Sequence, residues 1–378
     1  MKRLVIGISA EGSVVLLEGQ LRYFKDRGYE TFLLSPLSDR VKSFCDRESC
    51  THLVINIKRD ISPINDLINL GHIFLYLLRY KPDIINLGTP KVSLLGMVAA
   101  KLVGIPKRLY TCRGFRFEHE KGLKRKILIL MEKMTVSCSH KVICISPSVR
   151  DYGVNNGIFK KDQTIVINKG SSNGFNLKRF SPENISDDSK ADLKKTLGLD
   201  DKFVYGFVGR IYDRKGINEL YKAFSSLDTR LNNISLLIVG RFEESQIADK
   251  RIIGKIKEHN HIILAGSQKN IPLYLSVMDV FVMPAWGEGF GNVLIEAAAI
   301  GIPVISTDVT GTRDAVQHNF NGLLVEPKSV EQLTEAMLFL YNNKEVRESF
   351  GNNGVEWAKN FDNNIIWRGM DEIYNSAI

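Results

Sequence analysis

Short apolar runs alternate with longer amphipathic stretches through the first 170 residues. The apolar runs are rich in Val, Ile and Leu and have the length of buried strands, at residues 4–8, 31–34, 83–87, 108–112, 141–145 and 164–167. Between them, apolar residues recur at helical spacing, most clearly at 14–27, 65–80 and 123–136. This alternation predicts an α/β domain at 1–170 with a parallel, doubly wound sheet, whose ligands bind at the carboxyl ends of the strands.

The same alternation returns at 202–358. Apolar runs occur there at 203–209, 236–239, 262–264, 279–284 and 303–306, and a helix is expected from about Ile217. We therefore predict a second Rossmann-like domain. Residues 171–201 are rich in Gly, Ser, Asn and charged residues, which is typical of a linker. Residues 359–378 are expected to form an aromatic-rich terminal helix.

Length and composition fit two ordinary globular domains. The chain has 378 residues, 44% of them hydrophobic and 25% charged, and it exceeds the length of a usual single domain. No window approaches the roughly 20 apolar residues that span a bilayer, so we do not expect an integral membrane protein. The apolar run at 4–8 is expected to be the first strand, not a signal peptide. The five cysteines include no C-x-x-C pair and are expected to be reduced core thiols of a cytoplasmic protein.

Positive charge is concentrated in the first half of the chain. Residues 1–180 carry a net charge of +15 and residues 181–378 a net charge of −6, within a total of +9. We expect the first half to face an anionic partner, such as nucleic acid, an anionic membrane surface or a diphosphate-bearing substrate. Acidic residues are interspersed and no aromatic-basic stripe is present, so nucleic acid is the least favoured of these partners.

The most informative stretch is 285–297, AWGEGFGNVLIEA, which follows the predicted strand 279–284. Its glycines let backbone N–H groups approach a ligand, and the helix that begins after them directs its positive end to the same place. Glu288 and Glu296 frame these glycines, so that both carboxylates can face one crevice. This combination suits a nucleotide sugar, whose diphosphate lies between sugar and ribose hydroxyls. The alternative is a pair of acids that merely complements the helix dipole.

The step from Glu288 to Glu296 resembles the E-x7-E element of the retaining glycosyltransferases of family 4. That family has the GT-B fold, in which two Rossmann-like domains face each other and a terminal helix crosses back to the first domain. By this resemblance, Trp367 and Tyr374 would anchor the terminal helix. The resemblance implies that Glu288 contacts the donor sugar and Glu296 the ribose. It also places the residues between them at the donor, namely Gly289, Phe290, Gly291, Asn292 and Val293.

A second donor segment lies at the start of the second domain. Arg210 and Lys215, beside Gly209 and Gly216, flank a turn before a predicted helix, where two cations and free backbone donors suit a diphosphate. The turn resembles the family's V-G-R…K-G segment, whose cations neutralise the donor diphosphate, and an ordinary charged loop is the alternative. The resemblance further implies donor contacts near the nucleobase and phosphates from Gly240, Ser267, Ile271 and Arg313.

Strand ends of the first domain carry candidates for the acceptor and its phosphates. Gly12 lies in the loop after the first strand, and Gly174 resembles the glycine of the family's N-G-V-D segment. Lys91 lies on the opening turn of a predicted helix, where the dipole disfavours a cation. A cation at this position suggests phosphate binding, although a solvated surface lysine is at least equally compatible with the sequence.

The loop 113–119 offers two guanidinium groups and one carboxylate at a strand end. Arg113 and Arg116 suit a diphosphate, and Glu118 suits a sugar or acceptor hydroxyl close to the reaction. Family 4 enzymes commonly carry a histidine in this loop. Here Arg113 stands in that place and His119 follows six residues later, so we assign no catalytic histidine.

The predicted helix 123–136 is both basic and amphipathic. Its apolar positions 123, 127, 130, 131 and 134 share one face. Cationic residues border that face, namely Lys124, Arg125, Lys126 and Lys133. Such a helix can lie on an anionic membrane surface, and it can equally pack in the core with its lysines extended to solvent.

The segments 89–91, 113–118 and 170–174 resemble the subgroup of family 4 that builds capsule, exopolysaccharide and lipid-linked oligosaccharide repeats. The resemblance implies a retaining, metal-independent hexosyltransferase that moves an N-acetylated sugar from a UDP-sugar to a polyprenyl-diphosphate-linked saccharide. It would act peripherally on the inner face of the bacterial cytoplasmic membrane. The UDP-sugar is a co-substrate, and no cofactor, metal or nucleic acid is expected. The alternatives are a sugar-nucleotide epimerase or phosphorylase of the same fold, and a polyanion-binding module.

Overall fold

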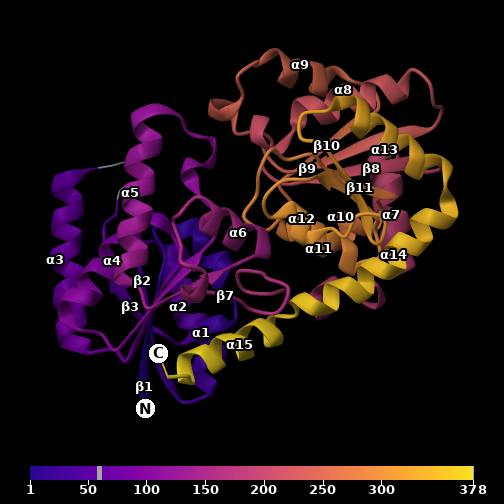
Figure 1. Ribbon diagram of the computed structural model, residues 1–378. Helices are drawn as coiled ribbons and strands as arrows, with labels where there is room; N and C mark the ends of the chain where they lie inside the picture. Colours follow the sequence, from indigo (N-terminus) through magenta and orange to yellow (C-terminus); the bar gives the residue numbers. More distant parts are fainter. Residues whose placement is uncertain (58–61, 378) are drawn as a thin grey trace. The chain divides into compact units, whose positions relative to one another are not determined.

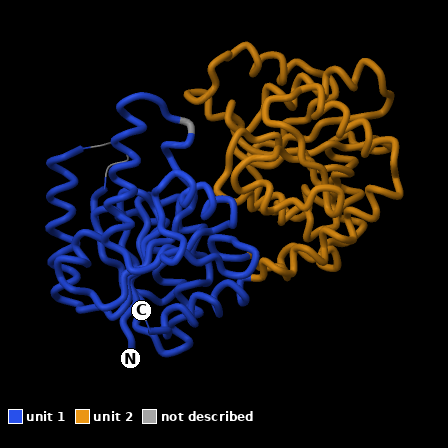
Figure 2. The backbone as a smooth tube through the Cα atoms, viewed as in Figure 1, with its two compact units in different colours: residues 1–174, 363–378 blue, residues 175–362 orange. Residues whose placement is uncertain are grey.

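The computed structural model describes residues 1–57 and 62–377, which form two compact units. Unit 1 comprises Met1–Gly174 together with the C-terminal segment that begins at Asn363, and unit 2 comprises Phe175–Asp362 (Figure 2). Each unit has its own parallel sheet with helices packed around it (Figure 1). The chain therefore passes from unit 1 to unit 2 within the segment predicted as a linker.

The sheet of unit 1 has seven strands in the order β3-β2-β1-β4-β5-β6-β7. Every neighbouring pair is parallel. The strands are β1 (Lys2–Gly7), β2 (Tyr29–Ser35), β3 (Thr51–Val54), β4 (Ile84–Leu87), β5 (Lys107–Cys112), β6 (Lys141–Cys144) and β7 (Thr164–Val166). The chain winds outward from β1 in one direction and from β4 in the other, which is the doubly wound topology that the alternating pattern predicts.

Helices cover both faces of this sheet. They are α1 (Gln20–Asp26), α2 (Asp39–Glu48), α3 (Pro63–Tyr80), α4 (Pro90–Val103), α5 (Gly122–Cys138), α6 (Pro147–Asn155) and α15 (Asn363–Asn375), with the short 3-10 helices η1 (Glu11–Leu17), η2 (Arg116–His119) and η3 (Lys161–Gln163). Apolar residues of β1, α1, α2 and α15 form one core, and those of β2, α3 and α4 form a second. Trp367 and Tyr374 of α15 are both buried in unit 1.

The helix predicted at 14–27 is wrong as one element, because the chain forms η1 and then α1. The two are separated at Gly19, whose φ is +76°. The ring of Trp367 packs against this glycine, and a Cβ on Gly19 would lie 2.8 Å from Trp367 Cη2. A side chain from the other end of the sequence therefore packs against the point where the two helices are separated.

The sheet of unit 2 has six parallel strands in the order β10-β9-β8-β11-β12-β13. The strands are β8 (Phe203–Val208), β9 (Ile234–Val239), β10 (Ile262–Gly266), β11 (Val280–Met283), β12 (Val304–Thr307) and β13 (Gly322–Val325). The apolar runs of the second half predicted all of these strands except β13. Here the winding direction reverses between β8 and β11.

Unit 2 carries eight α-helices within its described residues. They are α7 (Asp187–Leu197), α8 (Ile217–Asp228), α9 (Arg251–Glu258), α10 (Ile271–Ser276), α11 (Asn292–Ala299), α12 (Thr312–Ala315), α13 (Val330–Asn342) and α14 (Lys344–Ala358), with the 3-10 helices η4 (Leu177–Phe180), η5 (Pro182–Asn184), η6 (Asp213–Lys215), η7 (Glu244–Gln246) and η8 (Lys359–Phe361). Helix α7 lies in the segment expected to be irregular. It has no buried residue, and Ser186 caps it by accepting a hydrogen bond from the Ser189 N–H. A polar helix of this kind has no apolar face that a sequence pattern would reveal.

Candidate active site

The carboxyl ends of β8 and β11 form the centre of the candidate site in unit 2. These strands are neighbours, and the chain winds away from them in opposite directions. In open α/β sheets, ligands bind in the crevice outside such a switch point. The loop after β8 carries Arg210 and Lys215, and the loop after β11 carries Glu288. Two of the predicted donor segments therefore meet where this architecture binds ligands.

Lys215 and Glu288 are in direct contact. The Lys215 ammonium donates a hydrogen bond to Glu288 Oε1 and forms an ion pair with it. The side chains are 15% and 20% exposed, so the pair is shielded from bulk water yet accessible to a ligand. A partly shielded pair loses less of its attraction to solvent than a surface pair does.

Backbone contacts hold the two loops together. The Trp286 N–H donates to the Arg214 carbonyl over 2.9 Å. Gly216 has a φ of +75°, and a Cβ at this position would lie 1.9 Å from the Pro284 carbonyl oxygen. Only glycine combines this conformation with this close approach. The position of Lys215 beside Glu288 therefore depends on the glycine that follows Lys215.

A third loop supports Glu288 from the end of β12. The Glu288 N–H donates to the Thr310 carbonyl oxygen over 3.3 Å. Thr310 belongs to the segment that leads into α12, which also carries Arg313. Loops from three strand ends thus meet at Glu288, whose backbone N–H and carboxylate both have partners before any ligand binds.

Glu296 lies on α11, whose N-terminal cap is Gly291 with a φ of +73°. Burial raises the pKa of the Glu296 carboxyl to about 7, and the charge of Arg179 acts in the opposite direction. A carboxyl with this pKa changes near neutral pH from a group that can donate a hydrogen bond to one that only accepts. Arg179 comes from η4 and was not predicted, because no motif connects it to the stretch 285–297.

Two other predicted cations differ from Lys215 in their surroundings. Arg210 is exposed, and its guanidinium carbon lies 5.1 Å from the centre of the Tyr212 ring. Arg313 is paired with Asp308, with a distance of 2.9 Å between Nε and Oδ1. Arg210 is therefore oriented by an aromatic ring, whereas the charge of Arg313 is already partly neutralised within its own loop.

The remaining predicted donor residues lie in loops or in the first turn of a helix of unit 2. The Phe290 ring is buried against Phe361, with ring centres 5.2 Å apart, and acts as a packing group. Gly240 follows β9 directly. Among the others, Asn292 and Ser267 are exposed, and Gly289, Val293 and Ile271 are half-buried. Their assignment to the donor stays a prediction.

In unit 1, Arg113 follows β5 and has an unusual environment. Its Nε donates to Ser172 Oγ over 2.6 Å. Its Nη1 is buried without a hydrogen-bond partner in the described structure, against Gly88, where a Cβ would lie 1.6 Å from it. Burial lowers the pKa of the guanidinium to about 10. A desolvated cation that lacks a counter-charge is unfavourable, and binding of an anion would relieve this cost.

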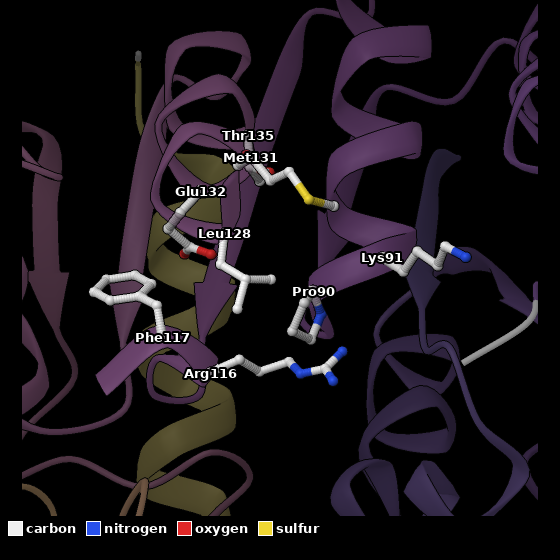
Figure 3. A pocket seen from close by; sticks show the side chains of 8 residues that line it. All are labelled: Pro90, Lys91, Arg116, Phe117, Leu128, Met131, Glu132 and Thr135. Carbon is white, nitrogen blue, oxygen red and sulfur yellow. The ribbon is translucent and has the colours of Figure 1, made fainter. Parts of the chain in front are cut away.

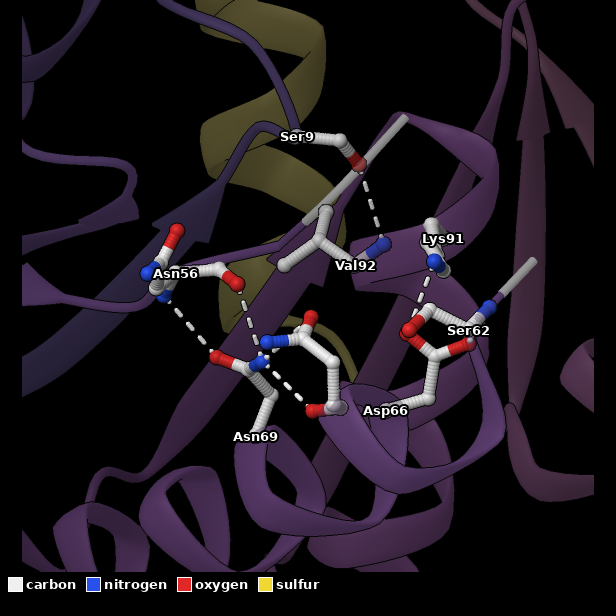
Figure 4. A network of polar contacts seen from close by, with 8 residues as sticks. Ser9, Asn56, Ser62, Asp66, Asn69, Lys91 and Val92 are labelled. Atoms are coloured by element: carbon white, nitrogen blue, oxygen red, sulfur yellow. Dashed lines mark hydrogen bonds and ion pairs between the residues drawn. The ribbon is translucent and has the colours of Figure 1, made fainter. Parts of the chain in front are cut away.

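Lys91 is engaged within unit 1. Its ammonium lies 2.7 Å from Asp66 Oδ1, and Lys91 is 7% exposed. Figure 4 shows this pair beside the bond from the Val92 N–H to Ser9 Oγ at the start of α4. The Lys91 charge is therefore balanced by a carboxylate in the free protein, and its contact with a phosphate stays a prediction.

The other acceptor candidates lie on or near short elements. Arg116 and Glu118 belong to η2, where Arg116 is exposed and Glu118 is half-buried. The side chain of His119 lies outside the described part of the structure. Gly12 lies within η1, and Gly174 is the last residue of the first segment of unit 1. Their contacts with an acceptor stay a prediction.

Glu132 is a carboxyl on α5 that was not predicted as a candidate residue, and it is only 8% exposed. Tyr110 of β5 donates its hydroxyl hydrogen to Glu132 Oε1 over 2.5 Å. Burial raises the pKa of Glu132 from 4.5 to about 7. On sequence alone Glu132 was indistinguishable from the exposed charges of this basic helix.

We predict that Glu132→Gln stabilises the protein at alkaline pH. The native state holds the Glu132 proton more tightly than the unfolded state, so stability falls as pH rises from 4.5 to above 7. The raised pKa corresponds to about 3 kcal/mol of lost stability. Urea unfolding of both proteins at pH 5 and pH 8 measures this effect. If the Glu132→Gln protein has no stability advantage over the parent at pH 8, the prediction is wrong.

Within the ranges 1–57 and 62–377, no group of three His, Cys, Asp or Glu side chains is placed to hold a metal ion. No helix in these ranges combines the length and apolar character needed to cross a bilayer. The five cysteines are free thiols, four of them buried.

Two family models together match most of the chain. The model described as Glycosyltransferase Family 4 matches residues 10–171, and the model described as Glycosyl transferases group 1 matches residues 188–357. The capsular polysaccharide biosynthesis glycosyltransferase CapM of Staphylococcus aureus is 34% identical, over 98% of this chain and 96% of its own. The chain belongs to glycosyltransferase family 4. The predicted resemblance is thereby confirmed.

Further relatives agree with membership of family 4. The N,N'-diacetylbacillosaminyl-diphospho-undecaprenol alpha-1,3-N-acetylgalactosaminyltransferase of Campylobacter jejuni is 25% identical, over 95% of this chain and 94% of its own. Among solved structures, that of Anabaena Alr3699/HepE in complex with UDP and glucose is similar to the present chain. The TM-score is 0.84, at 18% identity and full coverage of both chains. This structural likeness confirms the predicted GT-B fold class.

Proposed function

We propose that this glycosyltransferase moves an N-acetylated sugar from a UDP-sugar to a polyprenyl-diphosphate-linked saccharide, in the biosynthesis of a bacterial surface polysaccharide such as capsule. The observation that carries the proposal is the Lys215–Glu288 pair at the switch point of unit 2. The names of the relatives support the substrates, since one acts in capsular polysaccharide biosynthesis and another transfers N-acetylgalactosamine to a diphospho-undecaprenol-linked sugar. The Anabaena structure was solved with UDP and glucose.

On the donor side of the reaction, the side chains would act mainly by stabilising negative charge. When the bond between the anomeric carbon and the phosphate oxygen breaks, negative charge grows on the departing UDP. Lys215 and Arg210 would stabilise that charge, and such groups lower the barrier because they interact more strongly with the transition state than with the ground state. Glu288 would accept hydrogen bonds from the sugar and Glu296 from the ribose. Because side chains supply the positive charge, the proposed reaction needs no metal, and the configuration would be retained as in the family.

The acceptor side draws on unit 1. Its half of the chain carries the net charge of +15, and Arg113 provides a buried guanidinium whose Nη1 lacks a hydrogen-bond partner in the described structure. A diphosphate on the acceptor would supply the missing counter-charge. Arg113 would thus position the acceptor through its phosphates, and Glu118 would contact its sugar near the reacting hydroxyl.

Two helices of unit 1 present apolar residues to solvent. Of the eighteen large hydrophobic side chains that are exposed in the described structure, nine lie on α3 and α5. They are Ile64, Leu67, Ile68, Leu75 and Leu78 on α3, and Leu123, Ile127, Leu130 and Met134 on α5. Helix α4 packs against both of these helices. Most of the apolar face predicted for helix 123–136 is therefore at the surface and not in the core.

Lysines border the exposed face of α5, which favours an anionic membrane as its partner. Lys124, Lys126 and Lys133 are all exposed. Each cation near such a surface contributes about 1 kcal/mol of attraction, and apolar side chains that enter the headgroup region add to it. We therefore infer peripheral contact with the inner face of the cytoplasmic membrane, where a lipid-linked acceptor would be available.

A panel of nucleotide sugars tests the proposed reaction. UDP-linked sugars, UDP-N-acetylhexosamines in particular, are expected to raise the melting temperature more than GDP- or ADP-linked sugars do. Transfer of radiolabelled sugar to a polyprenyl-diphosphate-linked saccharide, followed by product analysis by NMR, tests both the reaction and the retained configuration. Activity in EDTA tests the independence from metal. Epimerised or phosphorolysed donor without labelled lipid product would refute the proposal.

We predict that the double variant Leu123→Asp, Leu130→Asp binds anionic vesicles at least tenfold more weakly than the parent. The substitutions replace two exposed apolar groups by charges that a negative surface repels. Co-sedimentation with phosphatidylglycerol-containing and neutral vesicles measures the effect. Phe339→Asp, at an exposed apolar residue of unit 2, is the control and should bind as the parent does. Equal vesicle binding by the parent and the double variant would exclude α5 as the contact.

A further inference from the structure

Unit 1 contains a small pocket between α4 and α5, bordered by η2 (Figure 3). It belongs to unit 1, whereas the predicted donor loops belong to unit 2, and its volume is about 40 Å³. Its lining residues are Pro90, Lys91, Arg116, Phe117, Leu128, Met131, Glu132 and Thr135. For comparison, one water molecule needs roughly 10–15 Å³ of such space. The pocket therefore has room for a few methyl-sized groups and not for a sugar ring.

The walls of the pocket are mostly apolar and its rim is cationic. Pro90, Phe117, Leu128 and Met131 supply hydrocarbon and aromatic surface. Arg116 is exposed, and no carboxylate of the described structure forms an ion pair with it. Figure 3 shows the Lys91 ammonium pointing away from the other lining side chains, in agreement with its pairing to Asp66. The pocket thus offers an apolar interior and one available guanidinium group.

The floor of the pocket restricts what can enter it. Glu132 is held by the hydroxyl of Tyr110 over 2.5 Å and has no ion-pair partner among the described residues. A phosphate inside the pocket would lie close to the Glu132 carboxyl group. The two groups would repel each other once Glu132 is ionised. An uncharged hydrocarbon group does not meet this repulsion. An anionic ligand must therefore keep its charge at the Arg116 rim and place an apolar part inside.

The pocket continues into the exposed apolar face of α5. Met131 lies one helical turn from both Ile127 and Met134, and Leu128 lies one turn from Met131. Ile127 and Met134 are 40% and 44% exposed. An apolar surface therefore runs along the helix from solvent to the pocket. A ligand with a long branched hydrocarbon chain could follow it, whereas a compact ligand would fill the pocket alone.

We propose that this pocket binds the first branched units of the acceptor's prenyl chain, with Arg116 contacting the diphosphate to which that chain is attached. The proposal rests on the proposed function, which requires a polyprenyl-diphosphate-linked acceptor. Under this proposal, the pocket of unit 1 recognises the lipid carrier of the acceptor, and the acceptor's sugar is recognised separately. Methyl branches at each isoprene unit match a pocket of this size, and the charge pattern matches an anion joined directly to a hydrocarbon chain.

Farnesyl diphosphate is a suitable probe, because it carries the same junction of diphosphate and isoprene on a short chain. Isothermal titration should show that the full-length protein binds it at least tenfold more tightly than inorganic pyrophosphate or farnesol. Leu128→Trp, which fills the pocket, and Arg116→Gln, which removes the rim cation, should each weaken binding at least tenfold. The matched controls are Leu102→Trp and Arg40→Gln, at exposed residues of unit 1 that do not line the pocket, and both should bind farnesyl diphosphate as the parent does.

The outcomes separate this proposal from the proposed function. If farnesyl diphosphate binds to folded Leu128→Trp and Arg116→Gln proteins within threefold of the parent, or binds no better than pyrophosphate, the pocket assignment is wrong. Arg116 is exposed, so its variant tests the proposal even if the tryptophan variant does not fold. Binding of UDP-sugars, measured on the same preparations, should be unchanged in every variant. Selective binding of farnesyl diphosphate without any donor binding would support the pocket and overturn the proposed function.

Discussion

Lys215→Ala is expected to lower kcat by a factor of about 100 to 1,000. The Lys215 ammonium lies at the switch point of unit 2 beside Glu288, where the negative charge of the departing diphosphate is expected to develop. Removal of one preorganised group that stabilises such charge typically has this effect on kcat. Donor affinity should change less, because the cation acts most strongly in the transition state. Steady-state kinetics with saturating UDP-sugar measures the change.

Arg214→Ala provides a matched control for this prediction. Arg214 precedes Lys215 in η6 and its side chain is exposed, so its loss should change kcat by no more than a few fold. Glu288→Ala combined with Lys215→Ala should cost less than the product of the two single effects, because contacting residues are not independent. Lys215 would lose its assigned role if the alanine variant kept more than a tenth of the parental kcat.

Glu296→Gln is expected to weaken UDP-sugar binding at pH 8 by at least tenfold and to abolish its pH dependence. Burial places the pKa of Glu296 at about 7, so the carboxyl is mainly protonated at pH 6 and mainly ionised at pH 8. An ionised carboxylate accepts hydrogen bonds from ribose hydroxyls more strongly than a neutral acid does. The parent should therefore bind the donor more tightly as pH rises through 7, whereas the amide stays neutral throughout.

Isothermal titration of an intact UDP-sugar at pH 6, 7 and 8 tests this expectation. Free UDP is unsuitable, because its terminal phosphate itself titrates near pH 6. Glu335→Gln, at an exposed acid on α13 of the same unit, should follow the parental profile. Parental affinity that stays constant from pH 6 to 8, or falls, would rule out the ionised carboxylate as the ribose acceptor.

Local patterns were sufficient for the order of most elements and for the loops that carry the donor motifs. Strand positions such as 83–87 and 279–284 were predictable because a strand buried on both faces requires a continuous apolar run. The glycines around Glu288 were informative because close backbone approach is possible for few other residues. Family membership followed from these same motifs, and the family models and the Staphylococcus aureus relative agree with it.

Contacts between distant segments were beyond the reach of such patterns. Arg113 was a candidate phosphate ligand, but its contacts with Ser172 and Gly88 depend on how separate strand ends meet. The amphipathic pattern of helix 123–136 was compatible with both core and surface. Sequence periodicity shows that a helix has an apolar face, but it does not show what that face contacts.

The sequence by itself determined the α/β alternation, the positions of the donor loops and the family of the enzyme, because these depend on residues that are neighbours along the chain. The tertiary structure alone decided that Lys215 contacts Glu288, that Trp367 packs against Gly19, and that Glu132 lines a pocket. Each of these depends on side chains that only the packing of separate strands and helices brings together. Burial then changes their charge properties, because desolvation acts on a group only after the fold has removed water from it.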